Sequence, residues 1–232
     1  MRGKYVLIMV FVLLLAPAII LNAANNEKTK SGVFIKYKPP MLGKPGNRVG
    51  GGTRGKGAIA TLVALVPDHI GFAATVQPSL CWFASKPLDM KVEITLNDVD
   101  SIQPLLEKQM DSPDKGEAQC IKLSDYGLRL TPKKEYEWFV SISPDPEQRS
   151  RDIVSGGLLV HKEPTATQAA KFASAKGVEL LLAYADEGFW YDAMAKLAEL
   201  MKANPGEKLY RDLETQLLEQ VDLREAAEEI HR

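Results

Sequence analysis

The sequence predicts a mainly β protein in which a β-sandwich is followed by a small helical region. Between Ala58 and about residue 162, apolar residues recur with a period of two, and Pro and Gly interrupt the pattern every few residues. That combination is typical of the short strands of a sandwich. After Pro164 the apolar period becomes 3.6, which is typical of amphipathic helices. We therefore predict four segments: a signal peptide at 1–24, a basic arm at 25–57, the sandwich at 58–162 and the helical region at 163–232.

The composition excludes several classes of protein. The chain has 232 residues, of which 45% are hydrophobic and 25% charged, and its formal net charge is −1. These values are ordinary for one or two globular domains, and they rule out a collagen-like chain, a disordered acidic chain and a polytopic membrane protein. A net charge so close to zero gives no global reason to expect nucleic acid as a partner.

The N-terminus has the layout of a secretory signal peptide. Arg2 and Lys4 precede an uncharged apolar run over Tyr5–Leu21, and the small residues Ala23 and Ala24 follow. This order predicts a Sec-type signal and a periplasmic or secreted protein. A retained membrane anchor is the alternative, because the run is nearly long enough to span a bilayer. Export would permit a disulfide and would remove ATP and nicotinamide cofactors from the surroundings.

The predicted arm at 25–57 is rich in basic residues, Gly and Pro. From Glu27 to Gly57 it holds eight basic residues and one acid. Such a stretch has little apolar surface to bury, so we predict an extended and mobile arm. Arg48, Arg54 and Lys56 are its candidate contact residues, for an anionic envelope surface or an acidic partner. A spacer without a partner is the alternative.

Alternation and apolar runs predict seven strands in the sandwich. In two of them the alternation is clean, with Val92, Ile94 and Leu96 on one face of the first. Spacing of this kind between turn residues favours an all-β sandwich. The predicted strands are Ala58–Val66, Ser79–Ala84, Lys91–Asn97, Gln103–Lys108, Glu117–Leu123, Glu135–Ile142 and Ile153–Val160.

A short motif indicates which kind of sandwich this is. Leu130 lies six residues before Tyr136, which opens the alternating strand that also carries Trp138. This resembles the tyrosine corner of immunoglobulin-like and fibronectin-type sandwiches, in which the Tyr hydroxyl bonds to upstream backbone and the ring fills the core. We therefore predict an immunoglobulin-like sandwich with structural roles for Tyr136 and Trp138.

The two cysteines lie on the second and fifth predicted strands. Trp82 is the expected inward residue of one strand and Ile121 of the other, so Cys81 and Cys120 would both point outward. These two strands are commonly neighbours in such a sandwich, which would place the cysteines within disulfide reach on the outer surface of one sheet. Two separate, half-buried thiols are the alternative.

The helical region is predicted as a small hairpin that packs on the sandwich. Thr165 and Thr167 are candidate N-caps, and Gly188 is expected to end one helix. The run around Gly188 is similar to the middle of a tetratricopeptide repeat, although one hairpin is not an array. Trp190 is expected to anchor the next helix by packing, with contact to a partner as the alternative. Asp192 would serve the dipole of that helix.

The motifs that suggest chemistry lack their structural context. Gly50 to Gly55 matches G-x-G-x-x-G, and with Lys56 it approaches a phosphate loop. Such loops need a strand before and a helix after, whereas here an arm precedes and a strand follows. The three histidines are far apart, and neither Cys-x-x-Cys nor Gly-x-Ser-x-Gly occurs. We therefore predict no nucleotide, no metal and no cofactor, and identify no catalytic residue.

Several blocks together resemble the domain of unknown function 928 family. The blocks are residues 37–48 with Gly50–Gly55, Leu62–Pro67 and Gly188–Ala193, and Pro78, Trp82, Tyr136 and Trp138 also fit its pattern. The resemblance covers nearly the whole chain after the signal and implies an exported envelope protein, without a reaction or catalytic residues. The family often has a Cys near the end of the Tyr-x-Trp strand, where this chain has Ser141 and Ser143.

Together these observations favour a binding or interaction module of the cell envelope. Sandwiches offer loops and strand edges, and helical hairpins offer grooves, all of which suit protein contacts. The expected partner is an envelope protein or an anionic envelope surface, with Arg48, Arg54, Lys56 and Trp190 as candidate contacts. A hydrolase whose site is assembled from scattered residues, or a purely structural envelope protein, are the alternatives.

Overall fold

The structure, a computed structural model, describes residues 32–40, 48–50, 61–85, 90–112, 117–145 and 147–230. The chain divides into two units at Gly32, and the described residues from Val33 onward belong to the second, compact unit. The predicted signal peptide, Arg54 and Lys56 lie outside the described residues. Among those that are described, no helix combines the length and the apolar composition that crossing a membrane requires.

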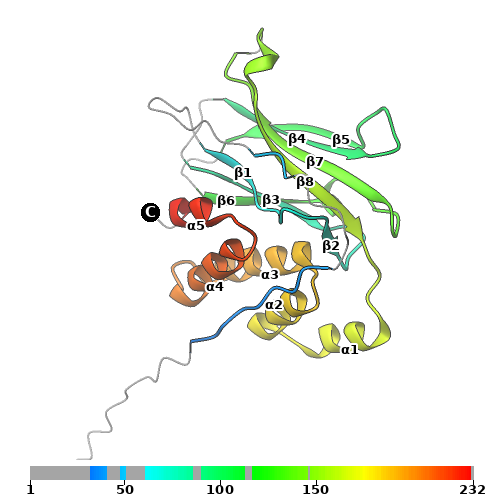
Figure 1. Cartoon of the computed structure of the whole chain (residues 1–232), viewed down its shortest axis with the longest axis vertical. Helices are drawn as coiled ribbons and strands as arrows, with labels where there is room; N and C mark the ends of the chain where they lie inside the picture. Colours follow the sequence, from blue (N-terminus) through cyan, green and yellow to red (C-terminus); the bar gives the residue numbers. More distant parts are fainter. Residues whose placement is uncertain are drawn as a thin grey trace, which may run out of the picture. The chain divides into compact units, whose positions relative to one another are not determined.

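The described strands form two sheets that share one hydrophobic core (Figure 1). Neighbouring strands are antiparallel except β2 and β8, which are parallel. The three-stranded sheet has the order β1 (Leu62–Ala64), β3 (Ser79–Ala84) and β6 (Glu117–Lys122). The five-stranded sheet has the order β2 (Gly71–Ala73), β8 (Ile153–His161), β7 (Glu135–Ile142), β4 (Lys91–Asp98) and β5 (Leu106–Asp111).

Most predicted strands are confirmed, with three differences. The strands β3 and β7 have the predicted bounds. The strand β5 begins three residues later than predicted, because the connection from β4 runs on through Pro104, which has no N–H to donate. The strand β2 was not predicted, since three residues are too few to show alternation. The first predicted strand is shorter, as β1 covers only Leu62–Ala64 among the described residues.

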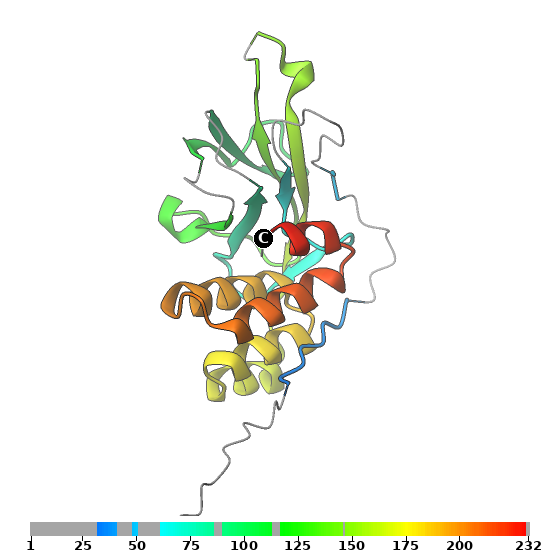
Figure 2. The same cartoon turned by 90° about the vertical axis from the view of Figure 1, so that its left-hand side faces the viewer.

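Residues 163–230, the described part of the helical region, form five helices rather than the predicted hairpin. Thr165 caps the first helix in a capping box with Gln168. The last helix follows Asp222, whose positive φ of 57° turns the chain. Its seven residues are mostly polar and too few to show a clear apolar period. The helices are α1 (Ala166–Ser174), α2 (Gly177–Asp186), α3 (Trp190–Ala203), α4 (Lys208–Glu219) and α5 (Arg224–Ile230), and they stack beside the sheets (Figure 2).

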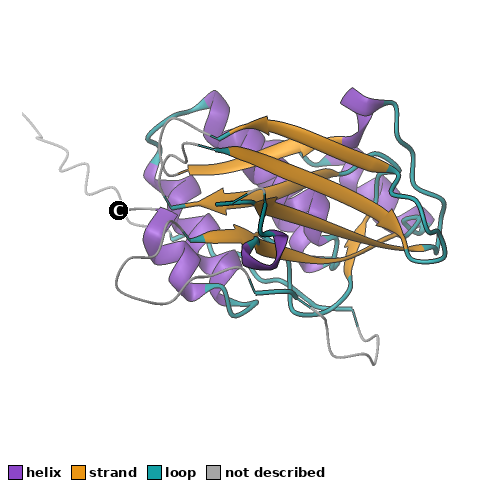
Figure 3. Ribbon diagram, turned by 90° about the horizontal axis from the view of Figure 1, so that it is seen from above, coloured by secondary structure: helices purple, strands orange, loops and turns teal. Residues whose placement is uncertain are grey.

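The three-stranded sheet is covered on both faces. All six residues of β3 are buried, and α3 contacts β3 and β6, while β1 contacts β7 and β8 of the other sheet. In the view from above, the strands lie in front of helices of the helical region (Figure 3). In contrast, β4 and β7 alternate between buried and partly exposed residues, so the five-stranded sheet keeps an open face beyond the helices.

Cys81 and Cys120 form a disulfide across β3 and β6. The two residues are directly opposite in the antiparallel register, with Cα atoms 4.1 Å apart. This is the register that the alternation predicts. The environment differs in part from the prediction, because Cys81 is only 3% exposed, whereas Cys120 on the edge strand β6 is partly exposed. The disulfide is therefore buried at β3 and partly open to solvent at β6.

Part of the predicted mobile arm is ordered and buried. Ile35 is 0% and Tyr37 5% exposed, and Val49 pairs with Gly156 of β8 in an isolated antiparallel bridge. The reason is an alternation of apolar residues that the basic composition obscured: Val33, Ile35 and Tyr37 share one side of an extended segment. We call residues Val33–Lys38 the N-terminal strap.

We expect the disulfide to stabilise the fold by about 4 kcal/mol in the chain-entropy model, because it closes a long loop. The double substitution Cys81→Ser/Cys120→Ser should lower the free energy of unfolding in urea by about that amount. The parent protein under reducing conditions serves as the control and should behave like the variant. Titration of the denatured, unreduced protein should find no free thiol, and two thiols per chain would contradict the bridge.

Candidate functional site

The first turn of α3 bonds the helical region to both sheets. Trp190 Nε1 donates to the carbonyl of Leu65 at 2.8 Å, at the point where the chain leaves β1. The Tyr191 hydroxyl donates to the carbonyl of Leu158 in β8 at 3.0 Å and accepts from Trp138 Nε1 in β7 at 3.0 Å. We call these contacts, with those of Asp192, the α3 junction.

Asp192 completes the α3 junction from a buried position. Its carboxylate accepts hydrogen bonds from the backbone N–H of Ala74 at 2.6 Å and of Thr75 at 3.3 Å, just after β2. Burial raises the pKa of Asp192 to about 7, although these bonds act in the opposite direction. The side chain is only 7% exposed. Asp192 lies in the first turn of α3, as predicted, and it also holds the end of β2, which no sequence pattern shows.

Two glycines allow close approaches around the junction. Gly188 has a φ of 79°, and a Cβ there would lie 2.7 Å from the carbonyl oxygen of Lys38 in the strap. A Cβ on Gly71 of β2 would lie 2.6 Å from the ring of Tyr191. Gly188 thus ends α2, as predicted, and also leaves room for the strap.

Two of the predicted contact residues, Arg48 and Trp190, are engaged inside the protein, and the other two lie outside the described residues. The guanidinium of Arg48 donates to the carbonyls of Val221 at 2.6 Å and Asp222 at 3.1 Å, and burial lowers its pKa. Trp190 is 0% exposed, so it is a packing residue and its ring is not available to a partner on the surface. Arg48 and Trp190 therefore lie in separate internal contacts rather than in one binding surface.

The described histidines are packing residues. His69 stacks on Tyr37 with ring centroids 5.7 Å apart, and its Nδ1 bonds to the carbonyl of Ile70. His161 is 2% exposed and bonds to the carbonyl of Ala73. His231 is outside the described residues. Within the part of the chain that the structure describes, no cluster of three metal-ligating side chains occurs.

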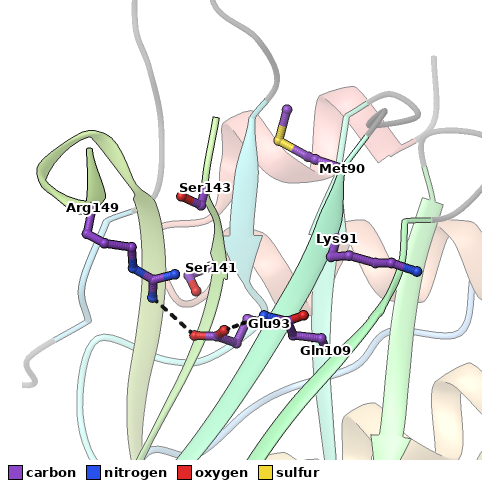
Figure 4. A pocket seen from close by; sticks show the side chains of 7 residues that line it. All are labelled: Met90, Lys91, Glu93, Gln109, Ser141, Ser143 and Arg149. Carbon is purple, nitrogen blue, oxygen red and sulfur yellow. Dashed lines mark hydrogen bonds and ion pairs between the residues drawn. The ribbon is translucent and has the colours of Figure 1, made fainter. Parts of the chain in front are cut away.

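A polar pocket of about 320 Å³ lies on the open face of the five-stranded sheet (Figure 4). Glu93 of β4 is directly opposite Gln109 of β5 on one side and Ser141 of β7 on the other, so the three side chains share one face. Arg149 reaches the pocket from a short 3₁₀ helix, Arg149–Arg151. We call this site the polar hollow, and its lining residues are Met90, Lys91, Glu93, Gln109, Ser141, Ser143 and Arg149.

Glu93 organises the polar hollow. Its carboxylate accepts a hydrogen bond from Gln109 Nε2 at 3.1 Å and pairs with Arg149 Nη2 at 3.4 Å (Figure 4). Arg149 also pairs through Nε with Asp152 at 3.0 Å. The two ion pairs together fix the orientation of the Arg149 guanidinium beside the hollow. The side chains of Arg149 and Lys91 remain 61% exposed. Lys91 pairs with Asp111 on β5, so both cations have acidic partners and still keep part of their surface open to solvent.

No sequence pattern indicates the polar hollow. The alternation of β4 and β7 does show that Glu93 and Ser141 point away from the core. Which outward residues become neighbours depends on sheet order, and β4 lies between β7 and β5. Arg149 belongs to a charged turn that resembles an ordinary solvated hairpin.

The fold and sites define a two-sheet domain with five helices joined to it by the α3 junction. The chain belongs to the family described as Domain of Unknown Function (DUF928), whose model matches residues 49–230. This confirms the resemblance carried by the sequence blocks. The match includes the polar hollow and the α3 junction and begins after the strap. Comparison with curated proteins and with solved structures finds no match.

We expect the stability of the protein to fall as pH rises from about 4 towards 7. The pKa of Asp192 is about 7 in the folded protein and 3.8 for the free side chain, so over this range the unfolded chain ionises and the folded chain does not. Buried Glu214, whose pKa is also about 7, adds to the effect. Each group contributes at most about 1.4 kcal/mol per pH unit.

Urea unfolding at several pH values measures this slope. In the Asp192→Asn variant the slope between pH 4 and 7 should decrease by about half, with Glu214→Gln as the matched comparison. The same slope in Asp192→Asn and in the parent would show that Asp192 does not carry the pH dependence.

Proposed function

We propose that this chain is an exported interaction module of the cell envelope, and that the polar hollow is its ligand site. One observation carries the proposal: side chains from three neighbouring strands and the 3₁₀ helix converge on one open face. The volume of the polar hollow, about 320 Å³, is at the lower end of the range for small-molecule pockets. The helices cover the three-stranded sheet instead, so this face stays free for a partner.

The exposed cations of the hollow are the groups that we propose contact an anionic ligand. Lys91 pairs with Asp111, and Arg149 pairs with Glu93 and Asp152, so an anionic ligand would have to replace one of these carboxylates as a partner. The Arg149 guanidinium has a planar set of donors that matches a carboxylate. Ser141 and Ser143 supply hydroxyl groups for neighbouring polar atoms. We therefore propose a small polar ligand that carries a carboxylate, presented by an envelope component.

Binding is favoured over hydrolysis by the state of the side chains in the hollow. A serine nucleophile needs a general base within hydrogen-bonding reach. The residues that line the hollow include two serines but no histidine, and the Glu93 carboxylate is already bonded to Gln109 and Arg149. The described histidines are packed elsewhere, against Tyr37 and the carbonyl of Ala73.

Export and envelope location rest on the N-terminal sequence and on the disulfide. The charged start, the apolar run and the small residues before Asn25 have the order of a secretory signal. The Cys81–Cys120 bridge supports this proposal, because structural disulfides persist in oxidising compartments such as the periplasm. The expected partner is thus an envelope protein or an anionic envelope surface.

We further propose that the two sheets form an immunoglobulin-like sandwich. The orders β1–β3–β6 and β8–β7–β4–β5 correspond to strands A-B-E and G-F-C-C′ of that fold, with β2 as an additional edge strand. The hydroxyl of Tyr136 accepts a hydrogen bond from the upstream N–H of Thr131 at 2.9 Å, which supports a tyrosine corner. The tetratricopeptide-like part would be the pair α2 and α3, which pack together.

A uronic acid and its neutral hexose test the proposed ligand class. We expect the uronic acid to shift the amide resonances of Glu93, Gln109 and Ser141, and the hexose to bind at least about tenfold more weakly, as for loss of one charged contact. Arg149→Ala should weaken binding by a similar factor. Arg151→Ala is the matched control, because Arg151 lies in the same short helix but does not line the hollow.

Equal binding of the acid by the Arg149→Ala variant and the parent would contradict the site. A small peptide with a free C-terminal carboxylate, compared with its amide, separates recognition of a carboxylate from recognition of a sugar. If neither carboxylate shifts the three resonances, the proposed ligand class is wrong.

A further inference from the structure

The N-terminal strap lies extended along α2 and α4 (Figure 1, blue) and is held by its backbone. Gln216 Oε1 accepts from the N–H of Ile35 at 3.1 Å. Gln220 bonds to the strap twice: Oε1 accepts from the N–H of Tyr37 at 2.9 Å, and Nε2 donates to the carbonyl of Ile35 at 3.1 Å. The N–H of Lys38 donates to the carbonyl of Ala185 in α2 at 3.1 Å.

Alternate side chains of the strap fill the groove. Ile35 is fully buried, and Tyr37 packs edge-on against Trp190 with ring centroids 5.0 Å apart. Lys38 pairs with Asp186 at the end of α2 at 2.5 Å. Phe34 lies on the other side of the strap and is 72% exposed. The groove therefore selects an apolar residue, an aromatic residue two positions later, and then a basic residue.

This is the physical pattern of extended-peptide recognition. Main-chain hydrogen bonds supply sequence-independent contacts, and pockets for alternate side chains supply selectivity. The strap also precedes every described strand and helix, so it can leave the groove without breaking a sheet pairing or a helix. A segment that lies outside every described sheet and helix and fits its own groove is suited to exchange between identical chains.

We infer that the groove along α2 and α4 is a binding site for an extended peptide, and that its occupant in trans is the strap of a second copy of this chain. The chain's own sequence is the one that the structure shows to fit, and each copy brings one strap and one groove. Exchange reproduces the same contacts in both copies. This site is distinct from the polar hollow, and the inference does not depend on the proposed ligand.

Cysteine pairing tests the exchange with an otherwise intact strap. Lys38 and Asp186 are adjacent in the groove, so one population carries Lys38→Cys and another carries Asp186→Cys. After mixing and incubation in a glutathione redox buffer, we expect a disulfide-linked heterodimer. The matched control pairs Asp186→Cys with Lys36→Cys, since Lys36 is exposed on the outward side of the strap. It should give at least tenfold less heterodimer.

A labelled peptide of residues 32–40 tests the groove itself. In the full chain, the strap substitution Tyr37→Ala should free the groove, so the peptide should bind at least tenfold more tightly than to the parent. The Phe34→Ala variant should bind the peptide no more tightly than the parent does. Adding Gln220→Ala to Tyr37→Ala should abolish the increase in peptide affinity. Far-UV circular dichroism checks that each variant is folded.

Two results would overturn the inference. If the mixed cysteine variants give no more heterodimer than the Lys36→Cys control, the straps do not exchange between copies, whether or not Tyr37→Ala folds. If the peptide binds while the straps do not exchange, the groove serves a different extended peptide and the second copy is the wrong occupant. If a folded Tyr37→Ala variant does not bind the peptide, the groove is not a peptide site.

Discussion

The rest of the structure depends on the α3 junction. Three consecutive residues, Trp190 to Asp192, bond to the chain after β1, to β7 and β8, and to the segment after β2. These contacts bury groups that would otherwise need water: an indole N–H, a phenol hydroxyl and a carboxylate. Each left unpaired would cost about 1–3 kcal/mol, so the junction is stable only when all partners are in place. We therefore expect the helices and sheets to form together. The same burial raises the pKa of Asp192.

The junction also determines which surfaces of the protein are available for the two proposed binding sites. Because α3 lies against β3 and β6, the central strand β3 of the smaller sheet and its Cys81 are buried. The five-stranded sheet keeps the open face on which Glu93, Gln109 and Ser141 meet. On the helical side, the groove beside α2 and α4 holds the strap, and Tyr37 of the strap packs directly on Trp190. One packing arrangement thus positions both proposed binding sites.

Local pattern was sufficient for some elements and insufficient for others. The strands β3 and β7 were predicted with their bounds, because an apolar run and a clean alternation are properties of a single strand. The register of Cys81 and Cys120 followed from alternation together with strand order. The polar hollow and the burial of Asp192 could not be predicted in this way, because they depend on which distant segments become neighbours. The strap shows a different failure, since basic composition concealed the alternation of Ile35 and Tyr37.

The central claim is that the α3 junction makes sheets and helices one cooperative unit. Hydrogen exchange measured by mass spectrometry across a urea series follows β7, which carries Trp138, and α4, which carries Leu217, in the same sample. We expect both segments to lose protection at one urea concentration in the parent. In Tyr191→Phe, which lacks the hydroxyl between Trp138 and Leu158, both should shift together to lower urea. Loss of protection in α4 well before β7 in the parent would contradict the claim.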